Sequence, residues 1–176
     1  MDSIKKKIRT IPDWPKKGVM FRDITTLLLD AQGLKEVVEE FKKRYENAGI
    51  GKVVGVESRG FITGALLAHT LGVGFVPIRK KGKLPAATTK IDYELEYGRD
   101  SMEVHSDAIK EGDRILLTDD LIATGGTAEA ACKLVEKLGG KIVECAFIIS
   151  LPELGGARKL ERQGYKVFSL VEFKGE

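Results

Sequence analysis

The feature that most constrains the fold is an alternation of short β-rich segments with helical segments along most of the chain. Residues 52–56 and 73–78 are β-rich and flank a helical segment at 61–71, which predicts a β-α-β unit. Alternation of this kind predicts an α/β fold with a mostly parallel central sheet flanked by helices. The chain contains no repeat or linker, so we expect residues 1–176 to form one domain. The remaining expected elements are strands at 114–118, 142–151 and 166–171, a helix that carries Ala131, Leu134, Val135 and Leu138 and ends at 139–140, and a short helix near 155–163.

The N-terminal segment and residues 79–112 depart from this alternation of strands and helices. Ile4, Ile8 and Ile11 recur at helical spacing until Pro12, which predicts a short amphipathic helix followed by an exposed extended segment. Apolar residues at helical spacing over 34–45 predict a longer helix. Residues 79–112 contain only short alternating pieces, which indicates a long loop or a loose hairpin.

Composition and charge narrow the class of protein. Hydrophobic residues make up 43% and charged residues 31%, and 29 Lys and Arg against 26 Asp and Glu leave a net charge of +3. These values exclude a disordered chain and argue against a nucleic-acid coat, but they suit a local basic pocket for a small polyanion. Cys132 and Cys145 lie in apolar surroundings, as expected of reduced, buried thiols. With neither a secretory signal pattern nor a membrane-spanning segment, we expect a cytoplasmic protein.

The most informative motif is the run from residue 115 to residue 127, ILLTDDLIATGGT. A buried strand brings Asp119 and Asp120 to its carboxyl end, and a turn of small residues then opens a helix. Such a turn can offer several backbone N–H groups to one anion, and the helix N-terminus adds positive potential. Two carboxylates beside that anion suit the vicinal hydroxyls of a sugar. Each feature alone is ordinary strand-end polarity or a tight turn, but together they predict a site for a ribose phosphate. The expected phosphate-binding residues are Ala123, Thr124, Gly125, Gly126 and Thr127.

This run resembles the phosphoribosyl-diphosphate motif of the type I phosphoribosyltransferases. Three further stretches narrow the resemblance to the adenine phosphoribosyltransferases in their short bacterial form: 18–24, 57–61, and 79–85 with 95–98. One departure is Thr118, where the family usually has an aliphatic residue of similar shape. The resemblance implies the type I phosphoribosyltransferase fold, with a small N-terminal hood at about 1–30 and a flexible catalytic lid loop at about 80–105.

A second turn, Glu57-Ser58-Arg59-Gly60, also ends a strand and opens a helix, so two anion sites face one edge of the sheet. The resemblance implies that this turn holds pyrophosphate and has a cis peptide bond between Glu57 and Ser58. Without the resemblance, Arg59 could be a solvated arginine, and the basic run 79–83 could be solvated surface. With it, the pyrophosphate-binding residues are Ser58, Arg59, Lys80, Lys83 and Tyr97.

Further roles come from the resemblance. Glu96 on the lid is expected to handle a proton on the purine ring and, with Arg59, to be catalytic, although a glutamate on a surface hairpin is usually inert. Met20, Phe21 and Arg22 are expected to bind adenine, with Phe21 stacking on the base, whereas by pattern alone Phe21 is a core aromatic. Trp14 and Phe75 are expected to pack structurally, and the isolated His69 and His105 are poor metal ligands.

The implied reaction joins adenine to 5-phospho-α-D-ribose 1-diphosphate (phosphoribosyl diphosphate) and yields AMP and pyrophosphate in purine salvage. Mg²⁺ is expected as cofactor, held mainly by substrate and water near Asp119 and Asp120, with no direct protein ligand. The resemblance implies a homodimer, with no nucleic-acid or membrane partner. Two alternatives remain: transfer to hypoxanthine, guanine or xanthine, and a regulator that senses phosphoribosyl diphosphate without catalysis.

Overall fold

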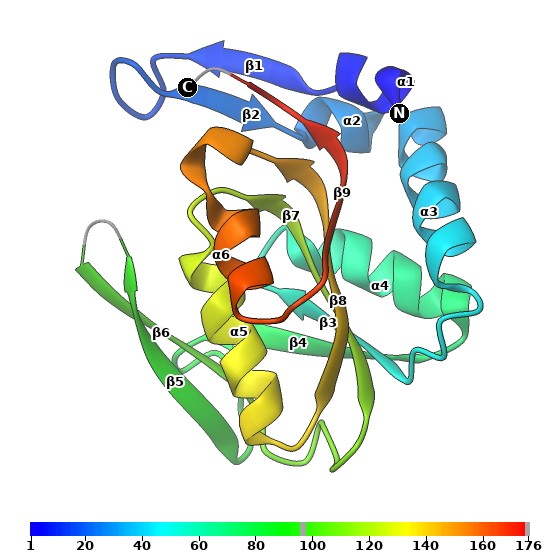
Figure 1. Ribbon diagram of the computed structural model, residues 1–176, viewed down its shortest axis with the longest axis vertical. Coiled ribbons are helices and arrows are strands. Elements are labelled where there is room, and N and C mark those ends of the chain that lie inside the picture. Colours follow the sequence, from blue (N-terminus) through cyan, green and yellow to red (C-terminus); the bar gives the residue numbers. More distant parts are fainter. Residues whose placement is uncertain (96–97, 175–176) are drawn as a thin grey trace.

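The computed structural model describes residues 1–95 and 98–174 and confirms the predicted α/β fold. A seven-stranded sheet forms its centre (Figure 1). Parallel pairing joins the five strands at one side, and antiparallel pairing joins the other two. From edge to edge the strands are β5 (Thr88–Leu95), β6 (Gly98–His105), β4 (Gly74–Lys80), β3 (Lys52–Val56), β7 (Arg114–Ile122), β8 (Lys141–Ser150) and β9 (Val167–Glu172).

Helices cover both faces of the sheet, because alternate residues of its central strands are buried on opposite sides. Leu117 of β7 belongs to a core with helices α5 (Gly126–Lys137) and α6 (Gly156–Arg162), and a 3₁₀ turn, Pro152–Leu154, precedes α6. Leu116 belongs to a second core with helices α3 (Ala31–Tyr45) and α4 (Gly60–Leu71). Figure 1 shows the two pairs of helices on either side of the sheet.

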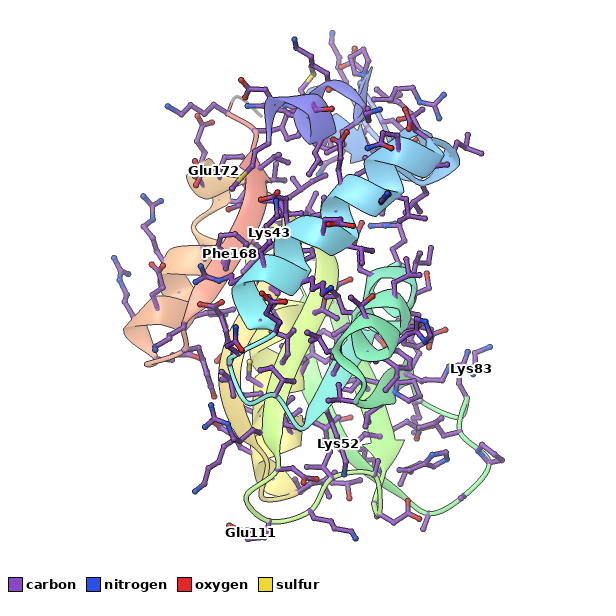
Figure 2. All side chains as sticks on the ribbon, turned by 90° about the vertical axis from the view of Figure 1, so that its right-hand side faces the viewer. Lys43, Lys52, Lys83, Glu111, Phe168 and Glu172 are labelled. Carbon is purple, nitrogen blue, oxygen red and sulfur yellow. The ribbon has the colours of Figure 1, made fainter. Side chains whose placement is uncertain are left out.

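Helix α3 packs through the apolar face that its periodicity predicts. Phe41 and Tyr45 are buried, and Phe41 meets Phe168 of β9 edge to face, with ring centroids 6.2 Å apart. Figure 2 shows Phe168 beside this helix. The guanidinium of Arg44 lies over the Phe168 ring and binds the buried Glu144 of β8, with Nε 2.6 Å from a carboxylate oxygen.

The N-terminal prediction is partly wrong. Helix α1 (Asp2–Lys6) ends before Ile8, and the chain then enters strand β1 (Arg9–Pro12), where Ile11 pairs with Phe21 of strand β2 (Met20–Asp23). The short helix α2 (Thr25–Leu29), which the sequence reading did not include, follows. In Figure 1 this antiparallel pair lies across one end of the molecule, next to the end of β9.

Of the two alternatives for residues 79–112, the hairpin is right, and it is more regular than expected. Strands β5 and β6 pair without interruption over eight residues each, and β6 also pairs with β4 through the Arg79–Glu103 register. The hairpin projects from the edge of the sheet in Figure 1. Within the described residues, no helix is both long and apolar enough to span a bilayer.

Candidate active site

The two predicted anion turns line one cavity of about 410 Å³. Strands β3 and β7 are parallel neighbours, so the turns that follow them emerge at the same edge of the sheet. The cavity wall consists of Glu57, Ser58, Arg59, Lys80 and the continuous run from Asp119 to Ala128. Residues that lie about 60 positions apart in the chain therefore meet at one polar site.

The turn predicted to bind phosphate keeps its shape through a close contact with the start of helix α6. Gly125 has φ +81°, which favours glycine, and helix α5 begins at the next residue. Gly156 donates its backbone N–H to the carbonyl oxygen of Ala123 over 2.9 Å. A Cβ added to Gly156 would lie 2.3 Å from that same oxygen and 2.6 Å from the nitrogen of Gly125. Gly156 thus supports the predicted turn, and the sequence reading did not single it out.

Asp119 and Asp120 both lie within β7, which runs further than predicted, to Ile122. Asp120 is 4% exposed, and one of its carboxylate oxygens lies 2.5 Å from Nε of Arg59. Burial, together with the neighbouring charge of Asp120, raises the pKa of Asp119 well above its ordinary value. The first turn of α4 can approach this pair only because Gly60 has no side chain, since a Cβ there would lie 2.9 Å from Oδ1 of Asp119.

The second turn has the cis peptide bond between Glu57 and Ser58 that the resemblance implies. The sequence reading left Glu57 without a role. Its carboxylate accepts a hydrogen bond from the backbone N–H of Lys80 over 2.8 Å and two longer hydrogen bonds from the guanidinium of Arg79, both over 3.3 Å. Arg59 is bound to Asp120 and faces the cavity. Burial opposes the charge of Arg59, but the carboxylates of Asp120, Asp119 and Asp23 together raise its pKa above the ordinary value.

The basic residues Lys80, at the end of β4, and Lys83, after it, differ in position. Lys80 lines the cavity, and its Nζ lies 3.3 Å from a carboxylate oxygen of Asp100 on β6. Lys83 is exposed and does not line the cavity, and in Figure 2 its side chain extends outward from the loop.

The predicted base-binding segment forms strand β2 and does not line the cavity. Phe21 meets Trp14 edge to face at a centroid distance of 4.4 Å. Arg22 is buried, with its guanidinium 4.6 Å from the centre of the Phe173 ring and one nitrogen 2.6 Å from the hydroxyl of Thr10. Trp14 therefore packs against a neighbouring ring as expected, although it is 51% exposed. Phe75 also packs as expected, against Phe61 with ring centroids 5.9 Å apart.

The remaining predictions concern two lid residues, the two cysteines and metal binding. Glu96 and Tyr97 lie outside the described residues. Cys132 and Cys145 are both buried and free, with their sulfur atoms 3.5 Å apart. In residues 1–95 and 98–174, no three His, Cys, Asp or Glu side chains gather into a group that could hold a metal ion.

Comparisons with known proteins agree with this geometry. The phosphoribosyl transferase domain model matches residues 25–175. The adenine phosphoribosyltransferase of Methylobacillus flagellatus is 64% identical over 98% of each chain. Among solved structures, the adenine phosphoribosyltransferase of Thermoanaerobacter pseudethanolicus superimposes with a TM-score of 0.93 at 50% identity, over 98% of this chain and 99% of its own. That of Saccharomyces cerevisiae, complexed with adenine and D-2,5-dideoxy-2,5-imino-altritol 1,6-bisphosphate, has a TM-score of 0.90 at 38% identity over 97% of each chain. The chain therefore belongs to the phosphoribosyl transferase domain family, and within it to the adenine phosphoribosyltransferases.

Proposed function

We propose that this cavity transfers the phosphoribosyl group of phosphoribosyl diphosphate to adenine, which yields AMP and pyrophosphate for purine salvage. The observation that carries the proposal is the pair of anion turns on the neighbouring strands β3 and β7, which suits a substrate with a phosphate at one end and a diphosphate at the other. Adenine and a bisphosphate occupy the related Saccharomyces cerevisiae enzyme, which supports the same substrate class here.

In this proposal, the turn from Ala123 to Thr127 binds the 5′-phosphate with the backbone N–H groups at the start of α5. The carboxylates of Asp119 and Asp120 accept hydrogen bonds from the two ribose hydroxyls. The negative charge that this pair carries also favours the positive charge that develops on the ribose ring as the glycosidic bond breaks.

Arg59 exchanges one partner for another when the substrate binds. The guanidinium is bound to Asp120, whose carboxylate is also the acceptor proposed for a ribose hydroxyl. A sugar that takes over this carboxylate leaves Arg59 free to bind the diphosphate, for which its planar fork is well shaped. Ser58, Lys80, Lys83 and Tyr97 complete the proposed diphosphate site.

The proposed cofactor is Mg²⁺. Two adjacent carboxylates at the cavity wall suit an ion that prefers oxygen ligands and keeps several waters, so Asp119 and Asp120 would hold it through substrate and water. When bound, Mg²⁺ neutralises charge on the leaving diphosphate.

Base recognition is assigned to the hood, residues 1–30, through Met20, Phe21 and Arg22. Glu96, on the proposed lid at 80–105, would handle the proton of the purine ring. Closure of the lid would exclude water from the reacting ribose.

The test is the conversion of labelled adenine to AMP with phosphoribosyl diphosphate and Mg²⁺, run beside hypoxanthine, guanine and xanthine. Turnover of adenine alone is expected. Asp120→Asn should reduce kcat/KM by about 10- to 100-fold, which is the worth of one hydrogen bond to a charged group. Asp113→Asn is the matched control, because Asp113 is also ion-paired, to Lys52 over 2.6 Å, but lies ahead of β7 at its opposite end. Tight binding of phosphoribosyl diphosphate without turnover of any base would favour the sensor instead.

We further propose that the protein acts as a cytoplasmic homodimer. Light scattering should then give a mass near twice the 19.3 kDa of one chain. A fully active species with the mass of one chain would contradict this.

A further inference from the structure

Glu103 is a buried carboxylate that the mechanism above does not use. It lies on β6, where it is opposite Arg79 of β4 and Lys90 of β5, and it is 5% exposed. Burying a carboxylate is costly unless hydrogen-bond donors surround it. Its partners therefore show what the residue does.

Those partners are consecutive backbone N–H groups of the basic loop, residues 80–84. One carboxylate oxygen of Glu103 accepts from Gly82 over 2.9 Å and from Lys83 and Leu84 over 3.2 Å each. The other oxygen accepts from the hydroxyl of Thr88 over 3.3 Å. Successive N–H groups that converge on one oxygen form a concave anion site, and here a side chain of the same protein fills it.

The local backbone is built for this contact. Gly82 has φ +79°, a conformation that L-residues rarely adopt, and it turns the neighbouring N–H groups toward one point. Burial alone would raise the pKa of Glu103, but the bonds from Leu84, Gly82, Thr88 and Lys83 hold it below the ordinary value. The carboxylate is therefore charged at neutral pH.

Two carboxylates accept backbone N–H groups of the basic loop, in addition to the bond from the N–H of Lys81 to the carbonyl oxygen of Ser101. Glu57 holds its start through the N–H of Lys80, and Glu103 holds the remainder from the hairpin side. Because Glu103 occupies the backbone donors, the side chains are the groups of this loop that remain for a ligand. Lys80 then lines the cavity, and Lys83 extends outward (Figure 2).

We propose that Glu103 is a positioning residue for diphosphate binding. It fixes the backbone of the basic loop that carries Lys80, which lines the cavity, and Lys83, which extends outward and would have to move inward to reach the diphosphate. This inference rests on the proposed role of those two lysines. It further implies that the β5–β6 hairpin and the basic loop move as one body, because a strand of the hairpin supplies the carboxylate.

The experiment measures KM for phosphoribosyl diphosphate and for adenine separately in Glu103→Ala. Loss of three hydrogen bonds to a charged group should release the loop and raise KM for phosphoribosyl diphosphate by roughly tenfold or more, while KM for adenine stays within about twofold. Glu103→Gln keeps one acceptor oxygen and should show the same selective change at a smaller size. If the alanine variant does not fold, the same two KM values are measured in the glutamine variant instead. Glu111→Ala is the matched control, because this exposed glutamate lies in the turn ahead of β7.

A double-mutant cycle with Lys83→Ala separates this inference from the function on which it rests. If Glu103 acts through the basic loop, the two substitutions together should raise KM for phosphoribosyl diphosphate by less than the product of their single effects. An effect of Lys83→Ala with no effect of a folded Glu103 variant would overturn the inference and leave the lysine assignment intact. No effect of Lys83→Ala would refute that assignment itself. An equal rise of both KM values in Glu103→Ala would show general damage and would also overturn the inference.

Discussion

Replacing Gly156 with alanine should disable the phosphate-binding turn while the rest of the fold remains. The added Cβ would lie 2.3 Å from the carbonyl oxygen of Ala123, 2.6 Å from the nitrogen of Gly125 and 2.8 Å from the carbonyl carbon of Thr124. All three are backbone atoms, so no side-chain rotation can relieve the contact. Either the turn or the start of α6 must shift. That shift distorts the hydrogen bond from the N–H of Gly156 to the carbonyl oxygen of Ala123.

The size of the effect follows from the overlap. Nonbonded heavy atoms prefer separations of about 3.5 Å, so the backbone must move by roughly 1 Å. Overpacking of this kind costs about 1–3 kcal/mol of stability, which corresponds to a fall in Tm of roughly 3–10 °C for a chain of this size. A displacement of about 1 Å at a binding site can cost about 100-fold in rate, so kcat/KM for phosphoribosyl diphosphate should fall by that order.

The assay pairs thermal unfolding with initial rates at varied phosphoribosyl diphosphate. Gly74→Ala is the matched control, since its added Cβ would only reach ordinary contact, 3.8 Å from the side chain of Lys52. A folded Gly156→Ala variant that keeps the kcat/KM of the parent would refute the reasoning. It would mean that the turn tolerates the displacement or is not where the phosphate binds.

Three further predictions concern stability and the thiols. The pKa of Asp23 is lowered to about 2, chiefly by Arg9. The ion pair therefore stabilises the fold fully above the ordinary pKa near 3.8, and this stabilisation is lost as pH falls through 2. In denaturant titrations, Asp23→Asn should be less stable than the parent at pH 7 and equal to it below pH 2. The bond to Cys145, together with burial, raises the pKa of Cys132, so both thiols should resist a thiol reagent until the protein unfolds, and rapid native labelling would contradict this. Phe41 is fully buried, and Phe41→Ala should lower the free energy of unfolding by about 3–5 kcal/mol, whereas a loss under 1 kcal/mol would show that its surroundings collapse into the space.

The sequence predicted well those elements whose apolar pattern follows directly from which of their faces are buried. Residues 52–56 were predicted as a strand and form β3, because a central parallel strand is apolar on both sides. The helix with Ala131 and Leu134 forms α5, because its apolar stripe faces the sheet. The two turns that line the cavity were located from the sequence because each ends a strand and opens a helix, and that order of elements is local.

The misread segments are those where a distant partner decides between two conformations. Three isoleucines at 4, 8 and 11 suit a helix, but Ile11 gains a partner strand only through pairing with Phe21. Strands β5 and β6 carry weak patterns of their own. They are regular because they pair with each other and because β6 docks on β4.

The sequence by itself predicted the fold class, through periodicity, and the family, through the resemblance of its motifs, and it located the two turns that meet at the cavity. Each of these depends on short stretches of chain. Only the tertiary structure decided how the site is held together. Arg59 meets Asp120 across 61 positions, Gly156 supports a turn some 30 positions earlier, and Glu103 fixes a loop 19 to 21 positions before it. Contacts of this kind leave no periodic signal, since each depends on which strands become neighbours in the folded sheet.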